Sequence, residues 1–308
     1  MRARRPDASG VVNRAGTGVY RERFGDSGQP TLFLQTDPIV ESWMWKAQIP
    51  WFARRHAIVT FDPRGTGRSD RPTDPSAYAD REFTADAIAV LDTTGIDRVV
   101  IVGLCQSAGV ALTLATEYPD RVAGVVAINP ALNVADPHPH RAPGGFDNAP
   151  TGDHGWQLEN RRHWERDWDR YCRFFFAEML PEPHSSKQRE DCVDWALSAT
   201  AITMLAYRSQ PPAARHDRTT AQAICRSVRC PVLVICGDED MCQPPERGRR
   251  VAEFTGAEFV IIEGAGHLPQ ARDPVKVNLE IGRFARQVAF AEARRLRPVP
   301  SQPMGQPG

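Results

Sequence analysis

Short apolar runs alternate with helical stretches along this chain, and this alternation limits its possible folds more than any other feature. The first runs are TLFL from Thr31, HAIVTF from His56 and DRVVIVG from Asp97, and turn residues end each of them. VAGVVAIN, CPVLVICG and AEFVIIEG follow, separated by helical stretches such as VKVNLEIGRFARQVAFAEARRL. Strands that alternate with helices build a mostly parallel sheet covered on both faces. We therefore predict an α/β fold.

The alternation is interrupted between Asn133 and Ile224. Trp, His, Arg and Phe are frequent in this part of the chain, as in HWERDWDRYCRFFFAEML. This composition indicates a helical insertion, so we predict an α/β core of residues 1–132 and 225–292 with a helical cap or lid at 133–224. Residues 293–308 are rich in proline and glycine and have little to bury, which predicts a flexible tail.

The most informative turn of the sequence follows the third apolar run. The residues GLCQS at 103–107 join that run to an alanine-rich helical stretch, which Pro119 ends. A sharp strand-to-helix turn with the pattern G-x-S-x-G holds its central side chain above a sheet. The frame set by Gly103 puts Cys105 at this centre. In one alternative Ser107 is the nucleophile, although it would lie inside the helix; in another, Cys105 is only a small buried residue.

Two further side chains with catalytic chemistry follow predicted strands. Asp240 lies in CPVLVICGDEDMCQPPE and His267 lies in EGAGHLPQARDP, while Asp238 and Glu239 compete for the role of the acid. In such a set the thiolate attacks, the imidazole moves the proton, and the carboxylate orients the imidazole. We therefore predict a triad of Cys105, His267 and Asp240, in which the histidine and the helix N-terminus lower the pKa of the thiol.

Taken together, these segments resemble the α/β-hydrolase superfamily over nearly the whole ordered chain. The resemblance rests on QTDPIVESWMWKAQIP, FDPRGTGRSDRP, GLCQSAGVALTLATEYPDRV, PVLVICGDED and EGAGHLPQARDP. It is strongest to bacterial single-domain esterases, acyl hydrolases and proline-iminopeptidase-like enzymes. It implies the α/β-hydrolase fold and a triad in the chain order nucleophile, acid, histidine. An aspartate at position 105 would have implied a haloalkane dehalogenase or an epoxide hydrolase, and Cys105 argues against both.

The resemblance also implies two backbone N–H donors for the oxyanion that forms during acyl transfer. One is the amide of Gln106, and the other lies in the loop after the first apolar run, at Thr36 or Asp37. In the family this loop typically opens with His-Gly, whereas here it reads Gln35-Thr36. This departure and the cysteine at position 105 weaken any inference of substrate from the common esterases.

A thiolate attacks activated acyl groups readily, so we predict a hydrolase of esters, thioesters or lactones with an acyl-thioester intermediate on Cys105. An acyltransferase to an alcohol, amine or thiol is the first alternative, and a hydrolase-fold binding protein without turnover is the second. We expect the cap to form the lid and the acyl pocket. Candidate wall residues are Trp156, Trp164, Trp168, Phe174, Phe175 and Phe176.

Charge and cysteine usage limit the expected partners and compartment. The 38 basic residues equal the 38 acidic residues, which gives no basic surface for nucleic acid or an anionic membrane. The seven cysteines have no paired zinc-ligand spacing, and no stretch approaches the roughly 18 apolar residues of a membrane helix. We expect a cytoplasmic protein without cofactor or metal. Its partner would be a small acyl compound, free or linked to a carrier or coenzyme A, and its oligomeric state is open.

Overall fold

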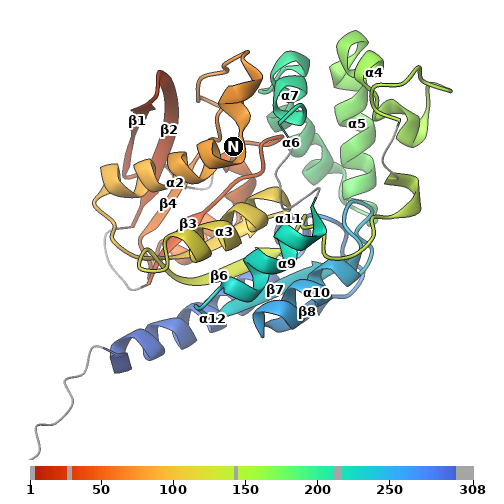
Figure 1. Cartoon of the computed structure of the whole chain (residues 1–308). Helices are drawn as coiled ribbons and strands as arrows, with labels where there is room; N and C mark the ends of the chain where they lie inside the picture. The colour runs from red at the N-terminus through yellow and green to blue at the C-terminus, as the bar shows by residue number, and fades with distance from the viewer. Residues whose placement is uncertain (1–3, 26–29, 142–144, 211–216, 296–308) are drawn as a thin grey trace, which may run out of the picture.

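The computed structural model describes residues 4–25, 30–141, 145–210 and 217–295, and within them one eight-stranded sheet runs through the molecule (Figure 1). The strand order is β1-β2-β4-β3-β5-β6-β7-β8. Strands β3 to β8 are parallel, and β1 and β2 join the β4 edge in antiparallel fashion. The strands are β1 (Ala8–Arg14), β2 (Thr17–Phe24), β3 (Thr31–Leu34), β4 (Ile58–Phe61), β5 (Val99–Leu104), β6 (Val122–Ile128), β7 (Val232–Gly237) and β8 (Glu258–Ile262).

The six apolar runs of the sequence form β3 to β8, which confirms the predicted mostly parallel α/β sheet. The hairpin of β1 and β2 was not predicted. Ala15 and Gly16 connect its strands with φ angles of 48° and 78°. Positive φ at both central residues is characteristic of a tight two-residue hairpin turn, and glycine favours this conformation. The dipeptide Ala15-Gly16 was therefore the sequence signal from which this hairpin could have been predicted.

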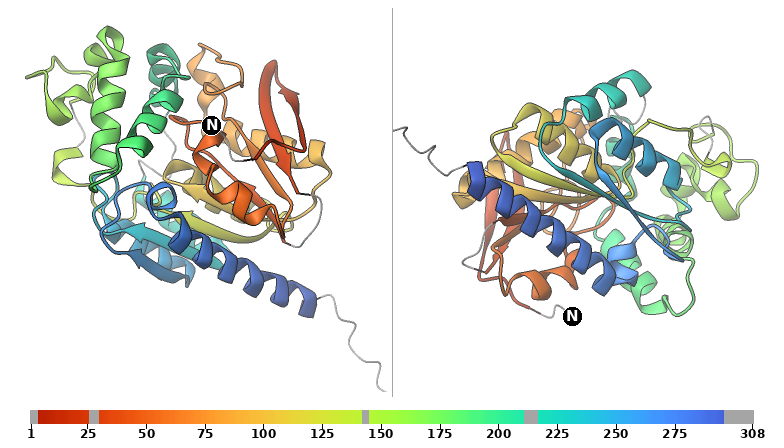
Figure 2. Two further views of the ribbon diagram at one scale, coloured as in Figure 1. Left: turned by 180° about the vertical axis from the view of Figure 1, so that it is seen from behind. Right: turned by 90° about the horizontal axis from the view of Figure 1, so that it is seen from below.

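Helices cover both faces of the sheet, as the views in Figure 2 show. The strands bury residues on each side, with Phe33, Ile101 and Val234 in one apolar cluster and Leu32, Val100 and Leu233 in the other. The first face is covered by α2 (Asp80–Thr94), α3 (Gln106–Glu117), α9 (Arg218–Ser227) and α10 (Pro245–Thr255), and the second by α1 (Gln48–Phe52) and α12 (Pro274–Arg295). Short helices in the connections are η1 (Ser42–Trp45), η2 (Pro75–Tyr78), η3 (Pro139–Arg141), η4 (Gly155–Leu158) and α11 (Pro269–Arg272).

Four of the helices between β6 and β7 stand together beside the sheet, in green in Figure 1. They are α4 (Arg161–Arg166), α5 (Trp168–Met179), α6 (Ser186–Ala196) and α7 (Ala201–Arg208). We call these four helices with η4 the cap.

The boundaries of the predicted cap and tail differ from the observed elements at two places. Helix α9 packs on α3 and α10, where Ala221 and Cys225 are fully buried, so the core resumes at Arg218 and not at 225. At the other end, α12 runs to Arg295, so the predicted tail begins with helix; its remainder, 296–308, lies outside the described residues. None of the helices in the described part of the chain is long and apolar enough to cross a membrane.

Candidate active site

The turn from β5 to α3 holds Cys105 in a strained conformation. Its φ is 54° and its ψ is −112°, a combination that a non-glycine residue rarely adopts. Helix α3 starts immediately after it and packs back onto β5. A Cβ at Gly103 would lie 2.6 Å from the carbonyl oxygen of Ser107, so only glycine allows this approach. The side chain of Cys105 therefore projects from a sharp turn at the N-terminus of α3.

Ser107 lies within α3, and its hydroxyl is used in the turn itself. The hydroxyl accepts a hydrogen bond from the Leu104 amide at 2.9 Å and lies 2.8 Å from the Leu104 carbonyl oxygen. The serine thus replaces the usual second glycine by binding the backbone that it packs against. This arrangement favours Cys105 over Ser107 as the reactive group.

His267 and Asp240 form a buried hydrogen-bonded pair on the loops after β8 and β7. The Nδ1 atom of His267 lies 2.8 Å from Oδ2 of Asp240. The other carboxylate oxygen accepts hydrogen bonds from the amides of Cys242, at 2.6 Å, and Gln243, at 3.0 Å. The competing Asp238 is exposed, and its carboxylate accepts the amide of Gly264 at 2.7 Å. Asp240 therefore has the position of the acid in a triad.

Backbone contacts fix the loop that carries His267. Asn129, at the end of β6, donates its side-chain amide to the His267 carbonyl at 2.9 Å and accepts the Gly237 amide at 3.1 Å. A Cβ at Gly237 would lie 2.2 Å from the carbonyl oxygen of Ala265. The amide of His267 in turn donates to the carbonyl of Met179 in the cap at 2.9 Å. The imidazole is thus held from both the sheet and the cap.

A second cysteine, Cys242, lies next to the predicted triad, and no role was predicted for it from the sequence. The sulfurs of Cys105 and Cys242 and a ring nitrogen of His267 all lie within 4.8 Å of one another. A hydrogen bond with Cys105 outweighs the effect of burial and, together with the positive charges of Arg141 and His267, holds the pKa of Cys242 well below that of an ordinary thiol.

The electrostatics of His267 follow from the same neighbours. Burial by itself lowers the pKa of an imidazole, because it disfavours the charged form. Here the charges of Asp240 and Cys242 outweigh burial and raise the pKa of His267 well above its usual value. Both shifts act toward transfer of a proton from the Cys242 thiol to this imidazole, which would leave a thiolate beside an imidazolium.

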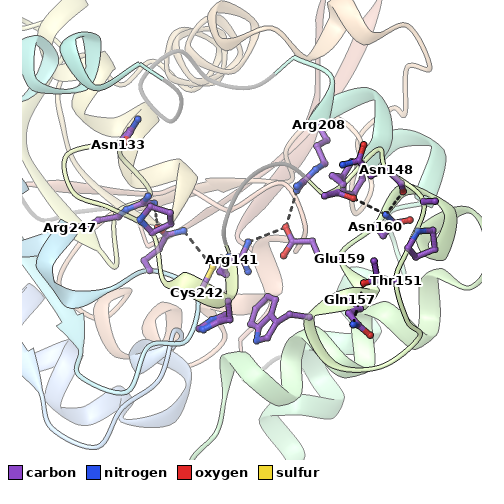
Figure 3. A pocket seen from close by; sticks show the side chains of 18 residues that line it. Asn133, Arg141, Asn148, Thr151, Gln157, Glu159, Asn160, Arg208, Cys242 and Arg247 are labelled. Atoms are coloured by element: carbon purple, nitrogen blue, oxygen red, sulfur yellow. Dashed lines mark hydrogen bonds and ion pairs between the residues drawn. The ribbon is translucent and has the colours of Figure 1, made fainter.

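A cavity of about 310 Å³ lies between Cys105 and the cap. Cys105 and Cys242 line it from the core, and Trp164 and Phe175 line it from the cap. A neighbouring cavity of about 570 Å³ shares Arg141, Glu159 and Arg208 with it and is drawn in Figure 3. Of the predicted wall residues, Trp156, Trp164 and Phe175 line these two cavities, whereas Phe176 is buried in an apolar cluster.

Glu159 organises the charged side of the larger cavity. Its carboxylate accepts hydrogen bonds from Arg141 at 3.3 Å and from Arg208 at 3.0 Å, and Figure 3 shows Arg141 lying between Glu159 and Cys242. The guanidinium of Arg141 also stacks on the ring of Trp156, 4.7 Å from its centre. Sequence reasoning did not single out Arg141 or Glu159, because isolated charges in a cap resemble a solvated helix face.

Two of the residues predicted to bind the oxyanion, Gln106 and Asp37, are hydrogen-bonded to each other. The amide of Gln106 donates a hydrogen bond to Oδ2 of Asp37 at 3.2 Å, and both residues line the smaller cavity. Asp37 was predicted as a backbone donor, but here its carboxylate lies at the amide that a substrate oxyanion would need. Thr36, the other predicted donor, is buried with its hydroxyl 3.4 Å from the Phe61 carbonyl oxygen. The Gln106 amide is therefore bound to the Asp37 side chain in this structure.

Comparison with known proteins agrees with this architecture. The sequence pattern of the α/β hydrolase fold matches residues 33–274, and the chain belongs to this family. Among curated proteins, Epoxide hydrolase A of Mycobacterium tuberculosis is 28% identical over 311 residues, which cover 89% of this chain and 96% of that protein. The observed sheet and this match together confirm the predicted α/β-hydrolase fold, and the chain is a hydrolase of this fold.

Solved structures show the same fold at low sequence identity. The enol-lactonase from Burkholderia xenovorans LB400 superimposes with a TM-score of 0.73 at 18% identity, covering 89% of this chain and 99% of that one. A thermophilic esterase from Thermogutta terrifontis superimposes with a TM-score of 0.69 at 23% identity, covering 91% and 99% of the two chains. At these identities the likeness establishes the fold, and the reaction has to be argued from the site.

Proposed function

We propose that this protein cleaves esters, thioesters or lactones, with Cys105 as nucleophile, His267 as general base and acid, and Asp240 as the carboxylate that orients the imidazole. One observation carries the proposal: Cys105 projects from the positive-φ turn at the start of α3, within 4.8 Å of an imidazole that Asp240 holds at 2.8 Å. The epoxide hydrolase relative does not change this inference. An alkyl-enzyme ester requires a carboxylate at the turn, and position 105 is a cysteine.

The proposed reaction has two steps. The thiolate of Cys105 attacks the acyl carbon. The oxyanion displaces the Asp37 carboxylate and accepts the hydrogen bond of the Gln106 amide. His267 gives its proton to the leaving group. Water then attacks the thioester while His267 removes its proton, and Cys105 leaves as a thiolate. The positive end of the α3 dipole stabilises negative charge at Cys105 and at the oxyanion.

Acyl transfer to another acceptor is a second candidate, and the burial of the site favours it. Only 7% of Cys105 is exposed. The cavity over it is lined by the aromatic residues Trp164 and Phe175 and also by charged side chains such as Arg141. A thioester on this buried sulfur is intrinsically more open to amines and thiols than an oxyester. An acceptor that fits the cavity would then compete with water for the acyl group.

Trapping of the acyl-enzyme tests the proposal. We expect an activated acyl ester to add one acyl mass to the wild-type chain in intact-protein mass spectrometry, and peptide mapping to locate it on Cys105. Cys105→Ala should lose the adduct and lower turnover by about 10⁴-fold or more. Cys225→Ala, a buried cysteine of α9, is the matched control and should retain both.

The decay of the adduct separates the two candidates. Loss in buffer at the turnover rate indicates hydrolysis, whereas persistence until an alcohol, amine or thiol is added indicates transfer. An adduct on Cys242, or turnover by Cys105→Ala without any adduct, would show that the assignment of the nucleophile is wrong.

A further inference from the structure

The site contains three donor atoms of the kind that transition metals prefer. The Sγ atoms of Cys105 and Cys242 and one ring nitrogen of His267 lie within 4.8 Å of one another, and all three side chains are buried. The acyl chemistry proposed above uses Cys105 and His267 and gives no role to the second sulfur. The acyl chemistry therefore does not explain why Cys242 lies beside Cys105 and His267. Its sulfur is close enough to both for the three groups to bind one ion.

The imidazole is already oriented as in a metal site. Its Nδ1 atom is bound to Asp240 at 2.8 Å, so Nε2 is the atom available for coordination. Metal-bound histidines typically give their other ring nitrogen to a carboxylate, and that carboxylate is itself held by hydrogen bonds. Asp240 meets this condition, because the amides of Cys242 and Gln243 hold its other oxygen.

The donor set selects the kind of metal. Two thiolates and an imidazole suit Zn²⁺, whereas Ca²⁺ and Mg²⁺ take oxygen ligands. Tetrahedral zinc with bonds of about 2.3 Å to sulfur and about 2.0 Å to nitrogen places its donors roughly 3.5–3.8 Å apart. Donor atoms no more than 4.8 Å apart approach this spacing through small side-chain rotations. Three protein ligands leave the fourth position to water or to a group in the cavity.

The geometry points to a zinc-binding site formed by Cys105, Cys242 and His267, in which bound Zn²⁺ blocks the nucleophile and its base. Binding requires both sulfurs as thiolates and a free Nε2 on the imidazole, so it releases to solvent the protons that these three groups carry. The metal would be a reversible inhibitor, because it occupies the sulfur that attacks and the nitrogen that moves the proton. The inhibition rests on the proposed function, whereas the binding does not.

Cobalt titration tests the binding separately from activity. The reduced full chain, freed of metal by a chelator and kept under nitrogen, should bind one Co²⁺ with a thiolate-to-cobalt charge-transfer band in the near ultraviolet, and Zn²⁺ should displace it. Cys242→Ala should weaken binding by about 100-fold or more, since loss of even an outer partner of a metal ligand costs 10- to 100-fold. Cys225→Ala should bind like the wild type. Circular dichroism checks that each variant is folded.

Several outcomes would overturn the site. The inference fails if the reduced protein gives no charge-transfer band, or if Cys242→Ala binds cobalt as tightly as the wild type. It also fails if Cys105 and Cys242 respond only to peroxide, with a mass loss of two hydrogens that a thiol reverses, because the pair would then be a disulfide switch.

Turnover completes the test. Zn²⁺ should abolish acyl turnover, and a chelator should restore it without added thiol. Full turnover by zinc-loaded protein would refute the inhibition. If the protein binds cobalt through these residues but is never acylated, the metal site is supported and the proposed function is refuted. If the protein is acylated but binds no metal, the proposed function is supported and the metal site is refuted.

Discussion

The strand-end loops of the core and the helices of the cap build opposite sides of one cavity by different means. On the core side, Gly103 and Gly237 make backbone approaches that no side chain would allow, and Cys105 sits at a positive φ. On the cap side, aromatic rings pack edge-to-face, as in the contact of Trp156 with Phe175. Backbone geometry tolerates little change, while ring packing can adapt. We infer that the core loops fix the positions of the reacting groups, whereas the cap helices determine which substrates fit the cavity.

The strongest test of the core side is Asp240→Asn. The amide cannot compensate the charge of the imidazolium and favours the wrong tautomer of His267, so kcat should fall by about 10³- to 10⁴-fold while the fold is kept. Steady-state kinetics with an activated ester measures the loss. Asp238→Asn, on the same loop but exposed, is the matched control and should stay near the wild-type rate. The reverse result would move the acid to Asp238.

Cysteine labelling compares the two regions directly. The pKa of Cys242 is held low by Cys105, Arg141 and His267, whereas burial raises the pKa of the cap cysteines Cys172 and Cys192. A thiol with a lowered pKa keeps more of its thiolate as the pH falls, so labelling of Cys242 should decline less between about pH 8 and about pH 6 than labelling of an ordinary thiol. The cap cysteines should label more than about 100-fold more slowly. Mass spectrometry of iodoacetamide-treated protein measures both, and equal rates at Cys242 and Cys192 would contradict the expected difference.

The same two regions differ in how far the sequence predicts them. The parallel strands and the positions of Cys105, Asp240 and His267 follow from local patterns, because the apolar runs that form β5, β7 and β8 each lead into a turn with polar or reactive side chains. Cys242 was missed because its meeting with Cys105 depends on tertiary packing of loops 137 residues apart, which no local pattern records.

The Asp37 carboxylate at the Gln106 amide escaped prediction for a related reason. The sequence indicated which loop would lie beside the helix start, but not whether its backbone or its side chain would face the site. In the cap, aromatic composition predicted helices without showing which rings would face the cavity. Trp156 and Phe175 line the cavities, while Phe176 is buried and lines neither.

Asp37 offers a gain-of-function test on the core side. Its carboxylate competes with the substrate oxyanion for the Gln106 amide and repels that oxyanion. Asp37→Asn removes the charge and keeps the shape, so kcat/KM for a neutral ester should rise by about tenfold, which corresponds to about 1.4 kcal/mol of transition-state free energy. Initial rates of the two proteins on one ester measure the change. A drop in rate would mean that the carboxylate assists the reaction and does not block the oxyanion site.

The smallest effect should come from the cap. Phe175 lines the cavity beside Trp164 and packs on Tyr171 with ring centres 5.6 Å apart, so Phe175→Leu should enlarge the acyl pocket without touching the triad. Because a methylene or two in an apolar pocket changes binding by only about 1–3 kcal/mol, kcat/KM should shift by about tenfold in favour of longer acyl chains. The value for the shortest ester should stay within a few-fold of the wild type. A series of acyl esters of graded length measures this. Phe176→Leu is the control, since that ring packs on Phe175 with ring centres 5.2 Å apart but lines neither cavity, so it should alter stability more than the preferred chain length. An equal loss on every ester in Phe175→Leu would mean that the cap positions the reacting groups, and the division between a chemical core and an adaptable cap would then be wrong.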